Sequence, residues 1–347
     1  MWRQNDMKKV LIEEPFRVSV KQDAQIPTPK EREALLQVMY CGICGADLAS
    51  YTGNQPFTTY PRVPGHEFSA RILDIAENEK GLKAGDIVTC NPYFNCGKCY
   101  SCRRGFVNCC TDNQTMGVQR DGAFQEYIAM PIERIIPGKG LTARQLALVE
   151  PFCIGHHGIT RGNVKKGDKV LVVGAGPIGM FAMLSAKAVG AEVYMTDLLD
   201  GRLSKATEMG ADGVVSGKNP DDLNALTQKI TNGDGFDVCV ECCGAPETFL
   251  TCIEQAAFAG KIILIGNGKR ETNCVHSILL KKELNVFGSR NAYSADFEQV
   301  IDILVSGKIN AEALVSAEYS LEQTGDAFEA LRHNSGDLMK VMLKAAE

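Results

Sequence analysis

Hydrophobic positions divide the chain into two parts with different periodicities. In the first 150 residues, short apolar runs with strand character are separated by turn-forming stretches such as Pro27-Thr28-Pro29 and Gly85-Asp86. This pattern predicts a β-rich domain. Its expected strands lie at residues 10–12, 18–20, 36–40, 87–89 and 127–129.

From Gly167 onward, buried-strand runs alternate with helical patterns. The apolar run at 169–173 is followed by glycines and by a helical pattern that reaches Val189. Alternation of this kind predicts a parallel sheet that is covered by helices on both faces. The remaining expected strands are 193–196, 214–215, 238–240, 262–265 and 286–287, the expected helices are 202–209, 221–230, 247–257 and 296–305, and the tail ends in an apolar piece at 339–343.

Composition and charge exclude several classes of protein. A length of 347 residues with 45% hydrophobic and 23% charged residues is typical of a globular protein, and the length suggests about two domains. The net charge of −5 provides no basic surplus for a nucleic acid partner. The longest charge-free apolar stretch, 170–186, contains glycines and is shorter than the ~20 residues of a membrane-spanning helix. Since the N-terminus has no apolar secretory signal, we expect a cytoplasmic protein without membrane contact.

A glycine-rich motif, Gly174-x-Gly176-x-x-Gly179, stands between the expected strand at 169–173 and the helix after it. This context is typical of a dinucleotide site, in which the glycines permit a tight turn, close approach of a pyrophosphate and close helix packing. Asp197 ends the next strand, where a carboxylate can accept hydrogen bonds from the adenosine ribose of NAD. Arg202 is near enough in sequence to keep NADP as an alternative.

Five of the fourteen cysteines are clustered in one short stretch. Cys96, Cys99 and Cys102 are followed by the adjacent pair Cys109 and Cys110. Four thiolates at such spacing can enclose a tetrahedral Zn²⁺, and a closed four-sulfur site is structural because no coordination position remains for a substrate. The spacing favours zinc over an iron–sulfur cluster, and it leaves open whether Cys109 or Cys110 is the fourth ligand.

A second metal site is suggested by residues that are far apart in sequence. Cys44, His66 with Glu67, and Glu150 offer a thiolate, an imidazole and carboxylates. Three such ligands with one open position are the arrangement of catalytic zinc. Their convergence is a hypothesis, because spacing alone does not bring them together.

In this order along the chain, the motifs resemble those of the zinc-dependent medium-chain dehydrogenases/reductases, over essentially the whole length. Within that family the chain most resembles the polyol and sugar-acid branch, with sorbitol, threonine, galactitol-phosphate and L-galactonate or L-gulonate 5-dehydrogenases. Residues 53–57 and 60–63 favour the sugar-acid dehydrogenases. The resemblance implies an α/β fold with two domains. These are a β-rich GroES-like catalytic domain at 1–154 and 290–347, with a structural-zinc lobe at 90–112, and a doubly wound parallel-sheet Rossmann domain for NAD at 155–289.

The resemblance also implies roles for single residues. Cys44 and His66 would bind the catalytic zinc with Glu67 or Glu150 as third ligand, while Asp47 would hydrogen-bond the far nitrogen of His66. It implies two zinc ions and NAD per chain, a small-molecule substrate and a homo-oligomer, either dimer or tetramer. The matched structural-zinc ligands are Cys96, Cys99, Cys102 and Cys110, and the matched cofactor positions are Gly174, Gly176, Ile178, Gly179, Asp197, Arg202, Ile265, Gly266, Asn267, Ser289 and Arg290.

One departure concerns the path of the alcohol proton. Many relatives carry Ser or Thr two residues after the metal cysteine and His three residues further on, but this chain has Ala46 and Ala49, which cannot transfer a proton. The implied activity is NAD-dependent oxidation of a secondary alcohol of a polyol or sugar acid, for example an aldonate at C5. The alternatives are a dehydrogenase for L-threonine or another small secondary alcohol, and a weakly active NAD-sensing relative. The candidates for a replacement relay are zinc-bound water with Glu67 or Glu150, and then Tyr51, His156 or His157.

Overall fold

A computed structural model describes residues 6–334 and 336–346 of the chain. The chain forms two compact units, the first made of Met1–Glu150 and Tyr293–Glu347 and the second of Pro151–Ala292. The boundaries predicted from the sequence lie close to these, after residues 154 and 289. Within the described residues, none of the helices combines the length and the apolar character needed to cross a membrane.

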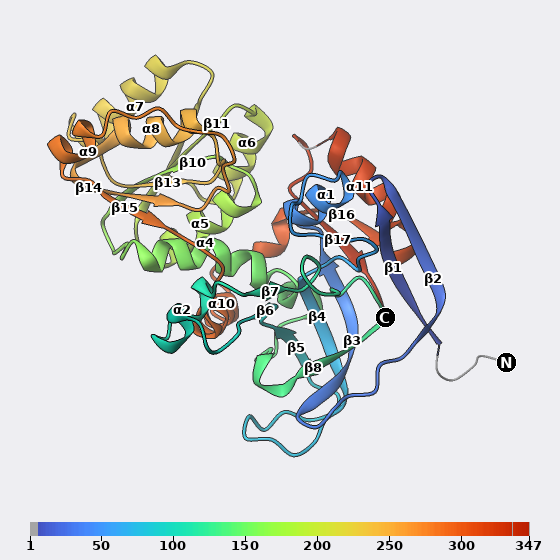
Figure 1. Cartoon of the computed structure of the whole chain (residues 1–347). Coiled ribbons are helices and arrows are strands. Elements are labelled where there is room, and N and C mark those ends of the chain that lie inside the picture. The colour runs from blue at the N-terminus through green and yellow to red at the C-terminus, as the bar shows by residue number, and fades with distance from the viewer. Residues whose placement is uncertain (1–5, 335, 347) are drawn as a thin grey trace. The chain divides into compact units, whose positions relative to one another are not determined.

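The first unit is built on a seven-stranded sheet (Figure 1). Its strand order is β16-β17-β3-β4-β5-β9, with β8 paired to β3, and β16 and β17 are its parallel pair. Two small two-stranded sheets, β1-β2 and β6-β7, accompany it. The strands are β1 (Asp6–Glu14), β2 (Arg17–Gln25), β3 (Glu33–Gly42), β4 (Glu67–Asp74), β5 (Ile87–Cys90), β6 (Tyr93–Phe94), β7 (Gln114–Thr115), β8 (Tyr127–Pro131), β9 (Ile135–Pro137), β16 (Val315–Ser320) and β17 (Lys340–Lys344).

The sequence predicted five strands of this unit and missed β4, β6, β7, β9 and β16, while β17 was expected only as an apolar piece at 339–343. The five expected strands fall inside β1, β2, β3, β5 and β8, which confirms them. In β4, Phe68, Ala70 and Ile72 alternate along the strand and are buried in the core, so the period-2 signal was present. The helices of this unit are α1 (Gly45–Tyr51), α2 (Tyr100–Arg103), α3 (Ala143–Leu146), α10 (Ser294–Val305) and α11 (Thr324–His333).

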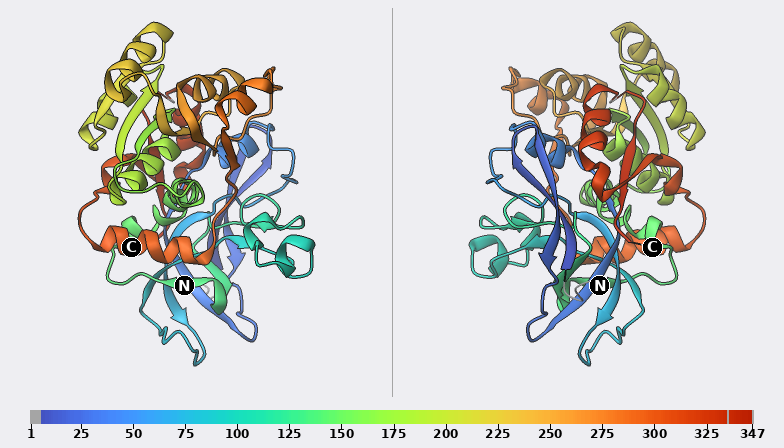
Figure 2. Two further views of the ribbon diagram at one scale, coloured as in Figure 1. Left: turned by 90° about the vertical axis from the view of Figure 1, so that its left-hand side faces the viewer. Right: turned by 90° about the vertical axis from the view of Figure 1, so that its right-hand side faces the viewer.

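The second unit is a six-stranded, all-parallel sheet with helices on both faces (Figures 1 and 2). Its order, β12-β11-β10-β13-β14-β15, places the first strand in the middle of the sheet, as in a doubly wound fold. The strands are β10 (Lys169–Val173), β11 (Glu192–Asp197), β12 (Gly213–Ser216), β13 (Phe236–Glu241), β14 (Ala256–Leu264) and β15 (Asn285–Gly288). The helices are α4 (Val149–Arg161), which begins just before this unit, α5 (Pro177–Ala188), α6 (Asp200–Glu208), α7 (Pro220–Thr231), α8 (Pro246–Gln255) and α9 (Ser277–Lys282).

The expected helix at 247–257 is too long at its C-terminal end. The helix α8 stops at Gln255, and Ala256 already pairs with Phe236 of β13 in the parallel sheet. The hydrogen bonds of a neighbouring strand therefore override the helical pattern at residues 256–257, and this tertiary effect is absent from the local sequence.

Candidate metal centres and dinucleotide site

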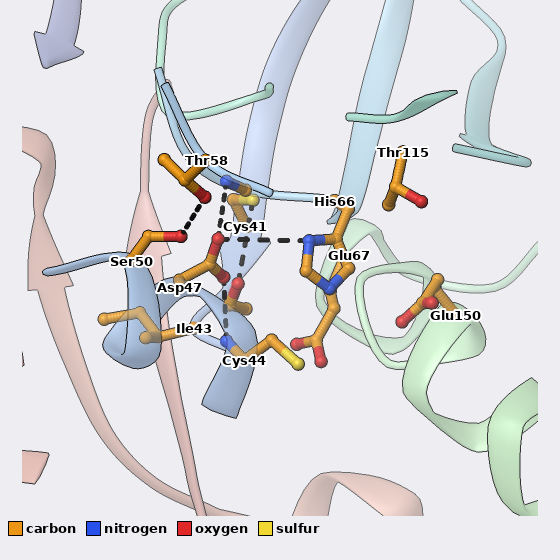
Figure 3. A network of polar contacts seen from close by, with 12 residues as sticks. Cys41, Ile43, Cys44, Asp47, Ser50, Thr58, His66, Glu67, Thr115 and Glu150 are labelled. Carbon is orange, nitrogen blue, oxygen red and sulfur yellow. Dashed lines mark hydrogen bonds and ion pairs between the residues drawn. The ribbon is translucent and has the colours of Figure 1, made fainter. Parts of the chain in front are cut away.

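Cys44, His66 and Glu67 meet at one edge of the sheet in the first unit (Figure 3). Their ligand atoms all lie within 4.8 Å of one another. The register of the sheet explains the convergence, because Gly42 at the end of β3 pairs with Glu67 at the start of β4. A thiolate, an imidazole and a carboxylate are the donors that zinc prefers, so this group fits a zinc ion.

Asp47 connects the segment around Cys44 to the segment around His66 through backbone hydrogen bonds, and not through the expected hydrogen bond to the His66 ring. Its carboxylate accepts hydrogen bonds from the backbone N–H groups of Cys44 and Gly65, both at 2.9 Å. The distance from its Oδ1 to Nδ1 of His66 is 3.9 Å, so the expected hydrogen bond is not formed in this structure. In Figure 3 the other ring nitrogen of His66 points away from Asp47, toward Cys44 and Glu67.

The electrostatics of the centre favour a cation. Burial alone lowers the pKa of His66, but the negative charges of Asp47, Cys44 and Glu150 outweigh this effect and raise the pKa well above its usual value. Burial raises the pKa of the Cys44 thiol, and the carboxylate of Glu67 adds to the rise. A bound metal ion would compensate this concentration of negative charge and hold Cys44 as a thiolate.

Lys340 is a member of this centre that the sequence analysis did not find. Its ammonium group forms an ion pair with Oε2 of Glu67, and both side chains are almost fully buried, at 4% and 1% exposure. Gly42 makes room for the pair, because a side chain at that position would overlap Oε2 of Glu67 and contact Cε of Lys340. The signal in the sequence was a lysine beginning an apolar terminal strand, and nothing local connected it to residue 67.

Glu150 lies beside the group of three but outside it. Its carboxylate, in the first turn of α4, accepts a hydrogen bond from the phenol of Tyr93, and both side chains are buried. Burial raises the pKa of Glu150 to about 7, with a further contribution from the charge of Glu67. Tyr93 is the second residue of this centre that the sequence analysis did not find.

Two of the proposed relay groups, Tyr51 and His156, form hydrogen bonds with residues outside the centre. The phenol of Tyr51 donates to Oε1 of Glu329 at 2.7 Å, and burial and this bond raise its pKa to about 12. Nδ1 of His156 lies 2.7 Å from Oγ of Ser185, within the core of the second unit. Both side chains thus have structural partners, and His157 is buried in α4.

The four-cysteine lobe brings Cys96, Cys99, Cys102 and Cys110 together, with their sulfur atoms within 4.8 Å of one another. Backbone amides of Cys102 and Thr111 lower the pKa of Cys99 to about 5, which favours the thiolate that binds metal. The side chain of Cys109 is exposed and lies outside the group of four. The arrangement fits a closed zinc site with four sulfur ligands.

In the second unit, the glycine-rich turn joins β10 to α5 as expected. Gly174 has φ +102°, and a Cβ at Gly179 would overlap the carbonyl oxygen of Gly174. Gly176 caps the N-terminus of α5, and a Cβ there would meet only Nη1 of Arg202, at 3.6 Å. This open space at a helix N-terminus fits a pyrophosphate.

Asp197 lies at the end of β11 and faces the same turn. Its Oδ2 accepts from the N–H of Ala175 at 2.7 Å, and its Oδ1 accepts from the N–H of Leu199 at 2.9 Å. A cavity of about 660 Å³ opens beside it. The cavity is lined among others by Gly174, Asp197, Arg202, Cys243, Glu247 and Arg270.

The remaining expected cofactor positions lie at the carboxyl ends of neighbouring strands. The N–H groups of Ile265 and Gly266 donate to the carbonyl of Glu241, at 2.9 and 3.0 Å. The N–H of Ser289 donates to the carbonyl of Leu264 at 2.8 Å. Ile178 is in the first turn of α5, while Asn267 and Arg290 follow β14 and β15. Among these positions, none lines the 660 Å³ cavity.

Comparisons with known proteins agree with this geometry. A family model described as zinc-binding dehydrogenase matches residues 177–306, and one described as the GroES-like domain of alcohol dehydrogenases matches residues 30–140. The chain is 33% identical to the L-galactonate-5-dehydrogenase of Escherichia coli K12, over 96% of this chain and 98% of the relative. It is 34% identical to a sorbitol dehydrogenase of Halalkalibacterium halodurans, over 93% and 94%.

A solved structure extends the likeness to three dimensions. The structure of an alcohol dehydrogenase from Escherichia coli CFT073, in complex with NADH, superimposes with a TM-score of 0.90 at 31% identity. The match covers 98% of this chain and 99% of that one. Both units therefore have counterparts in a protein that binds a nicotinamide dinucleotide.

Proposed function

Because this chain belongs to the zinc-containing medium-chain dehydrogenase family, whose members act on CH–OH groups, we propose that it oxidises a secondary alcohol of a polyol or sugar acid to a ketone with NAD. The convergence of Cys44, His66 and Glu67 carries the proposal, since three protein ligands would leave one coordination position of a zinc ion for a substrate oxygen. The L-galactonate and sorbitol dehydrogenases among its relatives support the substrate class.

The first unit carries the residues that would hold the metal ions. Cys44, His66 and Glu67 would bind one zinc ion, and Cys96, Cys99, Cys102 and Cys110 a second, structural one. Bound catalytic zinc supplies a Lewis acid that makes an alcohol easier to deprotonate. Asp47 orients the Cys44 and Gly65 backbone, and Lys340 neutralises the far oxygen of Glu67.

The second unit holds the hydride acceptor. The amide groups at the start of α5 would bind the pyrophosphate, and Asp197 would accept hydrogen bonds from the adenosine ribose. Two arginines line the adjoining cavity, and each faces a carboxylate: Nη1 of Arg202 is 3.7 Å from Asp197, and Nη2 of Arg270 is 2.7 Å from Glu247. This pairing supports NAD over NADP, because a 2′-phosphate needs a cation that is not already neutralised.

The proton leaves by a route without the usual hydroxyl relay. Ala46 and Ala49 have no exchangeable proton, and Tyr51 and His156 bond to Glu329 and Ser185. The acids that remain in this centre are Glu67, itself a proposed ligand, and Glu150 beside it. The proposed route therefore runs through a carboxylate of this centre.

A substrate panel and one variant test the proposal. NADH formation is measured over polyols, aldonates, L-threonine and simple secondary alcohols, with zinc counted by plasma emission spectroscopy. We expect turnover with a polyol or aldonate and two zinc ions per chain. Cys44→Ser should lose one zinc ion and all turnover while binding NADH with unchanged affinity. Retention of both zinc ions and of turnover by Cys44→Ser would contradict the proposal, and wild-type protein that binds NADH without turning over any alcohol would favour the sensor alternative.

A further inference from the structure

Two buried acids, Glu67 and Glu150, lie in the proposed catalytic centre, and each has a different partner. Oε2 of Glu67 pairs with Lys340, whereas Glu150 accepts a hydrogen bond from the phenol of Tyr93. Glu67 belongs to the group whose ligand atoms lie within 4.8 Å of one another, and Glu150 does not. The sequence left open which of the two acids binds the metal. The structure gives them different partners, Lys340 for Glu67 and Tyr93 for Glu150.

The backbone of Tyr93 is fixed by hydrogen bonds on both sides, and its side chain is buried. Its N–H donates to Oδ1 of Asn91 at 3.0 Å, and it pairs with Thr115 in the β6-β7 sheet. Its carbonyl oxygen accepts from Nη1 of Arg134, whose guanidinium also lies 4.3 Å from the ring of Phe94. Only 7% of Tyr93 is exposed. A donor fixed in this way can restrain the carboxylate that it bonds.

Resting on the proposed function, we propose that Tyr93 is a positioning residue that keeps the carboxylate of Glu150 off the catalytic metal. Cys44, His66 and Glu67 are then the three protein ligands, and the fourth coordination position stays open for the alcohol oxygen. A second carboxylate ligand would close the site to substrate, as four protein ligands do in structural zinc sites. The hydroxyl of Tyr93 acts through Glu150 and bonds to no reacting atom.

The experiment removes the hydroxyl of Tyr93 and measures the absorption spectrum of the metal ion in the catalytic site. Zinc in the holoenzyme is exchanged for Co²⁺, and the absorption of the catalytic site is obtained as the difference from Cys44→Ser, which keeps the four-sulfur site. Tyr93→Phe should change the Co²⁺ spectrum, because Glu150 becomes free to coordinate. Dipicolinate should remove the ion about tenfold more slowly, and kcat should fall about tenfold, within the range seen when partners of metal ligands are changed. The affinity for NADH should not change.

Two further variants separate positioning from general damage. Tyr51→Phe removes another bond between a tyrosine and a carboxylate of the same unit, the one to Glu329, and should keep the wild-type spectrum. In a Glu150→Gln background, Tyr93→Phe should change the dipicolinate rate by no more than about twofold, because the group on which it acts has been neutralised. Glu150→Gln alone should retain the catalytic Co²⁺ with an unaltered spectrum, and this result tests the proposal even if Tyr93→Phe does not fold.

Two results would overturn the inference. One is a folded Tyr93→Phe with the wild-type spectrum and wild-type dipicolinate rate. The other is loss of the catalytic ion from Glu150→Gln but not from Glu67→Gln, since Glu150 would then be the ligand. Both leave the proposed function intact, whereas failure of the proposed function appears as a Cys44→Ser variant that keeps its metal and turnover.

Discussion

Glu67 and Lys340 form an ion pair that is almost completely shielded from water, so each charge is compensated mainly by the other. Their side chains are 1% and 4% exposed. Removing one partner of a buried ion pair leaves an uncompensated charge, which typically destabilises a protein by about 3–5 kcal/mol. Replacing both partners avoids that penalty.

Lys340→Met should therefore lower the free energy of unfolding by about 3 kcal/mol. The double variant Lys340→Met with Glu67→Gln should recover most of this loss, although it would be impaired in metal binding. Urea unfolding of the zinc-free proteins, followed by circular dichroism, measures both without a contribution from metal binding. Equal losses in the single and the double variant would show that the pair does not carry the effect.

Asp197 is the residue that the proposal relies on for cofactor choice. Asp197→Ala removes an acceptor of charged hydrogen bonds, each worth about 1.5–3 kcal/mol. The dissociation constant for NADH should rise by about 10- to 100-fold, while NADPH, which gains relief from a negative charge, should lose less. Fluorescence titration with both cofactors measures the ratio, and an unchanged NADH affinity would remove Asp197 from the site.

At the scale of elements, helices α1 and α11 are joined by a carboxylate network. The phenol of Tyr51 donates to Glu329 at 2.7 Å and its ring stacks on Phe328 at 4.8 Å, while Nη2 of Arg332 lies 2.7 Å from the same carboxylate. The hydrogen bonds from Arg332 and Tyr51 lower the pKa of Glu329 to about 2, from an ordinary value of 4.5. The ionised form is therefore favoured by folding.

A lowered pKa gives stability that is fully present above pH 4.5 and is lost as the pH falls toward about 2. Glu329→Gln should remove this part of the acid dependence, so that its unfolding temperature falls less steeply with pH than that of the wild type. Thermal unfolding at closely spaced pH values below 5 compares the two slopes. Parallel slopes would mean that Glu329 is not linked to folding.

Elements and motifs with local signals were predictable from the sequence. Alternating strands and helices predicted the parallel sheet of the second unit, and the spacing of Cys96, Cys99 and Cys102 predicted their convergence. Tyr93 and Lys340 had no such signal. Their contacts to Glu150 and Glu67 arise from strand pairing and burial between distant segments, which a local pattern does not encode.

At the scale of the whole molecule, the two sites belong to two units with separate hydrophobic cores. Residues such as Leu36, Phe68 and Phe124 form the core of the first unit, and Leu171, Phe236 and Ile262 belong to a core of the second. The candidate zinc ligands are in the first unit, and the glycine-rich turn and Asp197 are in the second. Dinucleotide binding should therefore be separable from metal binding.

Protein from which zinc has been removed should still bind NADH, because the second unit has a hydrophobic core of its own. A ligand at about 100 times its dissociation constant stabilises the folded form by about 2.7 kcal/mol, so NADH should raise the unfolding temperature of zinc-free and zinc-loaded protein alike.

Cys110→Ser is the matched variant, because it removes one sulfur ligand of the four-cysteine group. It should release the zinc ion bound there and expose residues 96–113 to protease, because small metal lobes depend on their ion for folding. Its NADH-induced shift, measured by scanning calorimetry, should persist. Loss of NADH binding together with the metals would instead show that the fold of the second unit depends on the metal-bearing unit.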